Sequence, residues 1–225
     1  MDKSDGLVRQ LEKLSVDDSC SPGLNTVLRQ RLKEFAHTRN HNFQQDNIGN
    51  IYITRAGSDS ELSAIAVTFP LDSSNCWATL SSALQVFLDL ESIHTSCDIT
   101  LLGWSSPHDN PIGHNVWEGA ISLAAGYEQA AELKQFASLE DVRNFSLSAN
   151  FQLLETDEPL VAKGSPVLIQ KLQEAAAGQV KVILESPISK RVPVLSIQGK
   201  GAIAVAKLSV EYYSRYVVGL FENFD

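Results

Sequence analysis

The stretch that decides the fold is residues 66–80, which read AVTFPLDSSNCWATL. It continues an apolar run that begins at Ala64, ends that run at Pro70, and passes through Asp72 into a short polar turn before a helical pattern. Apolar runs bounded by turn residues are typical of buried strands, and α/β enzymes often place their chemistry just after such a strand. Only one ionisable side chain, Asp72, stands there. Its function therefore depends on which other polar groups join it.

The segments around this stretch alternate between strand and helix patterns. Residues 62–69 and 97–104 have the character of buried strands, and residues 79–90 between them carry apolar side chains at helical spacing. This β-α-β order predicts a largely parallel sheet. Further patterns predict helices at 24–38, 128–136, 166–177 and 206–222, strands at 145–154, 180–184 and 192–197, and a hairpin turn at 47–50. We therefore predict an α/β fold, a three-layer αβα sandwich.

Composition limits the number of domains and the classes of partner. The chain has 225 residues, of which 44% are hydrophobic and 20% charged, which suits one sizeable core. We predict a single α/β domain over residues 23–225, after an N-terminal helix and linker at 1–22. The formal net charge of -9, without clustered Lys and Arg, argues against nucleic acid and against a membrane surface as partners.

The cysteines and the first residues of the chain bear on its compartment. Cys20, Cys76 and Cys97 form no CxxC pair, and the N-terminus shows neither the apolar core of a signal peptide nor a membrane span. A reducing, cytoplasmic location is the expectation that follows.

Four segments, taken in order, resemble one enzyme family. They are DNIGNIYITRAG at 46–57, AVTFPLDSS at 66–74, LLGWSSPHDNPIGHNVWEGA at 101–120 and FQLLETDEPLVAKGSPV at 151–167. Their order and spacing resemble the dizinc aminoacylase and carboxypeptidase family, in particular its branch of N-carbamoyl amino acid hydrolases and allantoate amidohydrolases. The resemblance implies the catalytic domain of zinc aminopeptidases and carboxypeptidases, with a smaller lid or dimerisation domain inserted in it. Here residues 160–176 run almost directly into the closing strands, so we expect the lid to be missing.

Two histidine ligands that the resemblance implies are replaced by residues without a donor atom. Alignment on Asp72 puts the first of these histidines at Pro70, and alignment on Glu155 puts another at Leu153. A catalytic zinc needs about three protein ligands and an open position. Neither proline nor leucine can supply one.

The other positions of the implied metal site are also altered. The bridging aspartate falls at or near Trp77, the general-base glutamate at Pro107, and a neighbouring glutamate ligand at His108. Where the family carries a glycine followed closely by S-H-S, this chain has only residues 202–204, AIA. Asp72 alone is unchanged, so we expect no metal and no other cofactor.

Polar side chains still follow three of the predicted strands, and we expect them to meet at one edge of the sheet. They are Asp72, His108 with Asp109, and Glu155. Without a metal, His108 and either Asp72 or Asp109 form an acid/base pair in which the carboxylate orients the imidazole. The alternative is an exposed loop histidine followed by a turn aspartate.

Further residues are predicted to shape a pocket beside these groups. They are Trp77, Trp104, Ser105, Ser106, His114 and Leu153. Core packing is the alternative explanation for the tryptophans, and turn or helix-capping roles are the alternative for the serines, because no G-x-S-x-G segment frames them.

Three functions are open on this basis. The first is a metal-independent enzyme of amidohydrolase type that isomerises, dehydrates or cyclises a small organic metabolite, with Asp72 and His108 as acid and base. The second is a non-catalytic pseudoenzyme that binds a small molecule or a partner protein. The third is a residual amide hydrolase that holds one metal at Asp72, His108 and Glu155.

Overall fold

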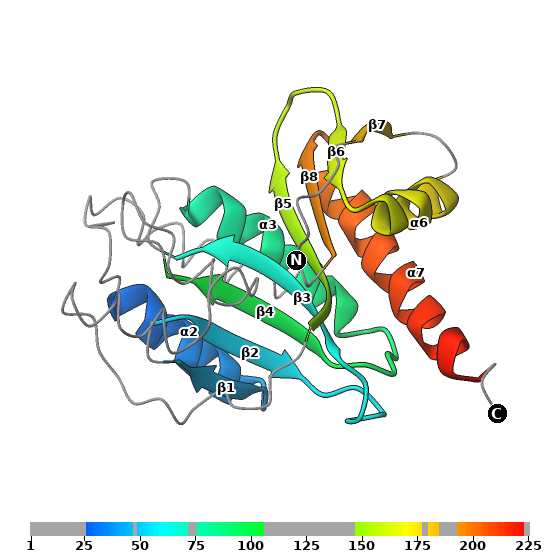
Figure 1. Cartoon of the computed structure of the whole chain (residues 1–225). Coiled ribbons are helices and arrows are strands. Elements are labelled where there is room, and N and C mark those ends of the chain that lie inside the picture. The colour runs from blue at the N-terminus through cyan, green and yellow to red at the C-terminus, as the bar shows by residue number, and fades with distance from the viewer. Residues whose placement is uncertain are drawn as a thin grey trace, which may run out of the picture.

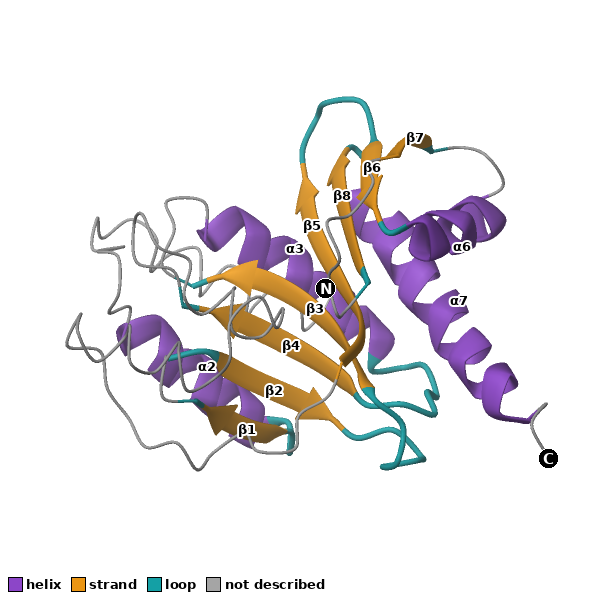
Figure 2. Ribbon diagram, viewed as in Figure 1, coloured by secondary structure: helices purple, strands orange, loops and turns teal. Residues whose placement is uncertain are grey.

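The computed structural model describes residues 26–46, 49–71, 76–105, 147–176, 180–184 and 193–222. Helices and one eight-stranded sheet account for most of them (Figures 1 and 2). The predicted N-terminal helix and linker and the helix predicted at 128–136 lie outside these ranges.

The first part of the chain builds half of the sheet. Its elements are α2 (Thr26–Thr38), β1 (Asn42–Gln45), β2 (Ile51–Arg55), β3 (Ala64–Pro70), α3 (Cys76–Leu90) and β4 (Ile99–Trp104). Strands β1 and β2 pair antiparallel across the predicted hairpin, and β3-α3-β4 is the predicted parallel unit.

The last part of the chain builds the other half. Its elements are β5 (Leu147–Glu155), β6 (Val161–Gly164), α6 (Pro166–Ala176), β7 (Lys181–Leu184), β8 (Val194–Gly199) and α7 (Ala202–Glu222). All except β6 were predicted within a few residues. Strand β6 has four residues, of which only Ala162 is buried, so its sequence carries little apolar signal.

The sheet has the order β1-β2-β4-β3-β5-β8-β6-β7, with β1 and β7 at its two edges. The four central strands β4, β3, β5 and β8 are mutually parallel. Toward the edges, β2 runs antiparallel to β4 and β6 antiparallel to β8. The expected largely parallel sheet is therefore found in the centre, and the sheet as a whole is mixed.

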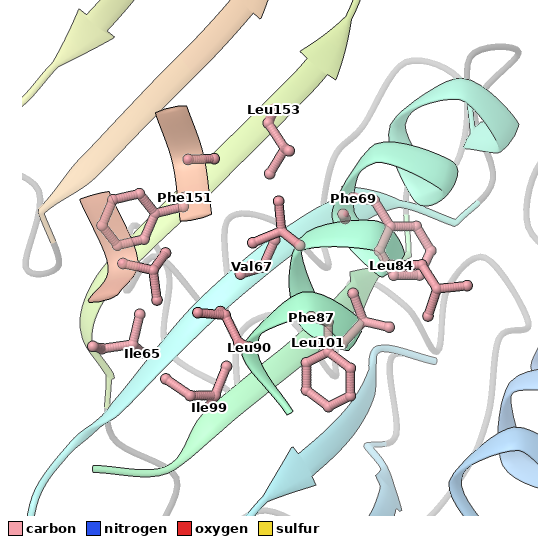
Figure 3. Close-up of a cluster of buried hydrophobic side chains, with 14 of the residues drawn as sticks. Ile65, Val67, Phe69, Leu84, Phe87, Leu90, Ile99, Leu101, Phe151 and Leu153 are labelled. Atoms are coloured by element: carbon pink, nitrogen blue, oxygen red, sulfur yellow. The ribbon is translucent and has the colours of Figure 1, made fainter. Parts of the chain in front are cut away.

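One face of the sheet carries the main hydrophobic core. Alternate residues of β3, Ile65, Val67 and Phe69, point to this face and pack with Leu84 and Phe87 of α3 (Figure 3). Side chains of α2, α6 and α7 join the same cluster. Because successive strand residues point to opposite faces, the helices cover the face that these odd-numbered β3 residues occupy.

The opposite face of the sheet has a different composition. Tyr52, Ala66 and Leu102 form a small buried cluster there, with Trp104 packed against it. Around them stand polar side chains, among which Thr54 and Thr100 share a hydrogen bond of 2.9 Å. The predicted α/β class is confirmed, and the described residues supply the sheet and the helical layer on one side.

The segment between β5 and β8 extends the sheet. Its elements β6 and β7 join the sheet beside β8, and α6 packs into the main core. Within the described ranges this segment contains no separate lid domain, as the sequence predicted. None of the described helices combines the length and apolar character needed to cross a membrane.

Candidate functional site

The order of the strands places a candidate site between β3 and β5. From β3 the chain continues to β4 on one side of it, whereas β5 and β8 lie on its other side. In open α/β sheets, ligands bind outside the carboxyl ends of the strands at such a reversal of strand order. Pairing between β3 and β5 ends at Thr68 and Gln152, although β3 runs on to Pro70 and β5 to Glu155. We call this point the β3–β5 fork (Figure 2).

Pro70 accounts for the position of the fork. The N–H of Leu71 donates to the carbonyl of Trp104 at 2.9 Å, so it points toward β4. Successive backbone N–H groups of a strand point to opposite sides, so the nitrogen of Pro70 faces β5. Proline has no N–H to donate there. The residue that stands where the resemblance implies a zinc-binding histidine thus also ends the ladder between β3 and β5.

Glu155, at the other arm of the fork, caps helix α7. Its carboxylate accepts hydrogen bonds from the N–H of Gly201 at 2.5 Å and from the N–H of Ile203 at 2.8 Å. The first N–H groups of a helix have no partner inside the helix, and a carboxylate also suits the positive end of the helix dipole. Gly201 has a φ of 89°, a left-handed conformation that favours glycine. Both oxygens of this predicted catalytic side chain are therefore engaged.

The backbone of Glu155 is fixed to helix α3. Its N–H donates to Oγ of Ser82 at 3.1 Å, and this hydroxyl donates in turn to the carbonyl of Ala78 at 2.9 Å. Ser82 is buried on the face of α3 that meets the sheet. The end of β5 is thus tied to the helix that leaves β3, which sets the relative position of the two arms.

A buried polar network lies at the same edge of the sheet as the fork, at the start of β2. The carboxylate of Asp46 accepts bonds from the N–H of Asn50 at 2.9 Å, from Nδ2 of Asn50 at 2.9 Å and from the hydroxyl of Tyr52 at 3.0 Å. Oδ1 of Asn50 accepts the N–H of Ser105 at 2.8 Å, so the network joins the end of β4 to the turn before β2. Burial, reinforced by the charge of Asp46, raises the pKa of Tyr52 well above its ordinary value.

This network was not predicted as part of the site. Asp46, Asn50 and Tyr52 all belong to the segment 46–57, which in the sequence contributes only to the family resemblance. Asp46 is 3% exposed and Asn50 is fully buried, so the carboxylate at this strand end is buried and accepts hydrogen bonds from Asn50 and Tyr52. Such an arrangement fixes the loop geometry around the strand ends.

The four predicted pocket residues that the structure describes lie in different surroundings. Trp77 packs against the helix-side core, whereas Trp104 packs against the cluster on the opposite face of the sheet. Leu153 is buried in the helix-side core (Figure 3), and Ser105 is buried within the Asp46 network. Five further predicted residues lie outside the described ranges: Asp72, Ser106, His108, Asp109 and His114.

The described positions of the implied zinc site do not fit a metal. Pro70 and Leu153 offer no donor atom, and both oxygens of Glu155 are engaged by helix α7. In the part of the chain that the structure describes, no three His, Cys, Asp or Glu side chains are grouped so that they could hold a metal ion.

Comparison with known proteins defines the class at the level of the fold. The sequence matches no family model and no curated protein. Solved structures with this fold include proteins described as an amidohydrolase/peptidase, as an amidase and as a zinc-dependent exopeptidase, in line with the sequence resemblance. The likeness of the chain to their catalytic domains is thus one of architecture.

Three of these structures illustrate the likeness. A protein described as an amidohydrolase/peptidase from Burkholderia cenocepacia has a TM-score of 0.66 and 11% identity, over 96% of this chain and 98% of that one. An amidase of the hydantoinase/carbamoylase family from Burkholderia multivorans has a TM-score of 0.53 and 12% identity, over 98% and 75%. A protein from Bacteroides vulgatus described as a zinc-dependent exopeptidase has a TM-score of 0.54 and 12% identity, over 94% and 95%.

Proposed function

We propose that this protein keeps the architecture of an amidohydrolase or peptidase as a metal-independent, non-catalytic binding protein, with a small organic molecule as its ligand at the β3–β5 fork. One observation carries the proposal. The two carboxylates described at the strand ends, Asp46 and Glu155, have every oxygen hydrogen-bonded to the protein's own donors. These bonds fix the orientation of both carboxylates toward the protein's own donors, so a metal or a substrate proton would compete with them.

The residues at the fork support a ligand of apolar character. Pro70 ends β3, the buried Leu71 follows it, and Leu153, also buried, stands on β5 where the resemblance implies a histidine. Loss of charged ligands lowers the polarity of the strand ends, which favours burial of apolar surface over ionic recognition. A partner protein bound at the fork is the alternative to a small molecule. The two alternatives differ in the mass of the molecule that co-purifies with the protein.

A second function, metal-independent acid/base catalysis on a small metabolite, is favoured by one different observation. The bond from the N–H of Leu71 to the carbonyl of Trp104 holds the ends of β3 and β4 side by side. The chain segments that contain Asp72 and His108 therefore start from neighbouring points of the sheet. An isomerase, dehydratase or cyclase built on that pair would need no metal.

Metal analysis tests the common part of both functions. The purified protein is assayed for zinc by elemental analysis, and its thermal unfolding is recorded with and without a chelator. We expect no stoichiometric zinc and no change in Tm on chelation. Stoichiometric zinc with a fall in Tm on chelation would return metal-dependent amide hydrolysis to first place, because a structural or catalytic metal stabilises the folded state.

A further inference from the structure

The sheet face opposite the helices carries a group of buried polar atoms that nothing in the described structure satisfies. Among the described residues, four buried side-chain nitrogen or oxygen atoms have no hydrogen-bond partner. Three of the four belong to Thr68 and Asn150, namely Oγ1 of Thr68 and both Oδ1 and Nδ2 of Asn150. Thr68 is 2% exposed and Asn150 is fully buried.

The register of the strands brings these atoms together. Asn150 of β5 lies opposite Ala66 of β3, and Thr68 is two residues further along β3 on the same face. Thr68 and Asn150 are thus diagonal neighbours across a strand pair, a spacing of roughly 7–8 Å between their Cα atoms. The side chain of Ala66, which lies between them, ends at Cβ and reaches no further from the sheet.

The neighbouring polar groups on this face are satisfied. Thr100 bonds to Thr54, and the hydroxyl of Ser196 donates to Oε1 of Gln152 at 3.1 Å. Among the described residues of this face, the unsatisfied atoms therefore lie around Ala66. An amide buried without partners costs roughly 2–7 kcal/mol, depending on the reference state, so binding of a molecule that completes its hydrogen bonds would be favourable.

We propose that Thr68 and Asn150 form a binding site for a small neutral molecule that carries an amide-type group. The amide of Asn150 offers one donor and one acceptor side by side, which matches a carboxamide in a pair of hydrogen bonds. The described residues on this face of the central strands carry no charge, so an ion has no counter-charge there. Leu102 and Trp104 supply an apolar wall beside the polar spot.

This site is separate from the β3–β5 fork and does not depend on the proposed function. Asn150 pairs with Ala66, four residues before Pro70, which corresponds to about 13 Å along the strand. The site lies on the face of the sheet rather than at the strand ends. It would also remain if the fork proved to be a catalytic centre.

Thermal unfolding with a matched pair of probes tests the site. The full chain is titrated with acetamide and, separately, with sodium acetate at matched ionic strength, and Tm is followed in the wild type, Asn150→Leu and Thr68→Val. We expect acetamide to raise the wild-type Tm relative to both variants, saturably, by on the order of 4 °C at tenfold excess over its dissociation constant. Acetate should produce no such difference. Thr68→Val removes only the hydroxyl from a side chain of the same shape, so it serves if Asn150→Leu does not fold.

The control is Ser196→Ala, on the same face but with a hydroxyl that is already bonded. This variant should respond to acetamide as the wild type does. Equal acetamide dependence in the wild type and in both site variants would overturn the proposal. So would an equal response to acetate, or an absence of any response together with a lower Tm of Asn150→Leu, which would mean that internal water already completes the bonds of the amide.

Discussion

Glu155 and Ile203 are joined by a hydrogen bond of 2.8 Å from the backbone N–H of Ile203 to the carboxylate of Glu155. The two residues belong to different elements, the end of β5 and the first turn of α7. A side chain that the sequence placed among catalytic groups therefore links a central strand to the helix that closes the chain. Its contribution is measurable as stability.

Replacement of Glu155 should weaken this link. We expect Glu155→Ala to lower the free energy of unfolding by about 2 kcal/mol, because two helix N–H groups lose their acceptor and the helix dipole loses a favourable charge. Glu155→Gln, which keeps an acceptor but no charge, should cost about half as much. Urea unfolding gives both values. The exposed Glu158 provides the control, and a loss in Glu158→Ala equal to that in Glu155→Ala would contradict the assignment.

The hydroxyl of Tyr52 should contribute to stability at neutral pH and lose that contribution in alkali. Burial and the neighbouring charge of Asp46 raise the pKa of Tyr52 in the folded state. A raised pKa means that the stabilisation is complete below the unfolded pKa of about 10 and is lost as the pH rises above it. We expect Tyr52→Phe to cost about 1 kcal/mol at pH 7 and to unfold less steeply with pH above 10 than the wild type.

Absorbance at 295 nm checks the same assignment. Tyr52 should ionise at a higher pH than Tyr212, and its signal should be missing in Tyr52→Phe. The exposed Tyr212 provides the control. Ionisation of Tyr52 at the same pH as that of Tyr212 would show that its hydroxyl is not buried beside Asp46.

Cys97 should be chemically inert in the folded protein. Its side chain is buried, and burial raises its pKa from 9.0 to about 11. The thiolate is the reactive form, so iodoacetamide at pH 8 should modify Cys97 only after unfolding. The same shift means that the stabilisation from the neutral thiol is present below about pH 9 and is lost as the pH approaches 11. Peptide mapping by mass spectrometry measures the modification, and rapid labelling of native Cys97 would refute its burial.

Asp72→Asn separates the two proposed functions. If the protein is a binding protein, native mass spectrometry should find the same bound mass in the variant as in the wild type, with affinity changed by no more than a few-fold. Complete loss of the bound mass in a folded variant would count against this function. If the protein is an enzyme, the variant should lose turnover of that compound. Asp157→Asn, at an exposed position, is the matched control.

Local patterns were sufficient for the framework of the fold. The apolar run of β3, the helical spacing of α3 and the apolar run of β4 each carry their own signal, and their order predicts a parallel unit. The sequence did not show where strands β3 and β5 separate. Pro70 ends the β3–β5 ladder because its nitrogen, which has no hydrogen, faces β5. What this nitrogen faces depends on which strand becomes the neighbour.

The roles of the candidate site residues were harder to predict, because they depend on partners far along the chain. Glu155 bonds to residues 46 and 48 positions later, and Asn50 bonds to a residue 55 positions later. The two tryptophans illustrate the same limit. Trp77 lies a few residues after one predicted strand and Trp104 is the last residue of another, yet they pack on opposite faces of the sheet. Position relative to a predicted strand therefore indicates the edge of the sheet near which a side chain lies, but not the face on which it packs.

The seam between β3 and β5 has a consequence for how the chain assembles. Strands β1 to β4 all precede residue 106 and strands β5 to β8 all follow residue 146, so each half of the sheet comes from one continuous piece of chain. During synthesis, β3 leaves the ribosome as an unprotected apolar edge and stays so until β5 is made. A strand that is buried on both faces in the finished protein is thus a site for aggregation while the second half is absent. The same division makes the two halves natural candidates for expression as separate fragments that associate along this seam.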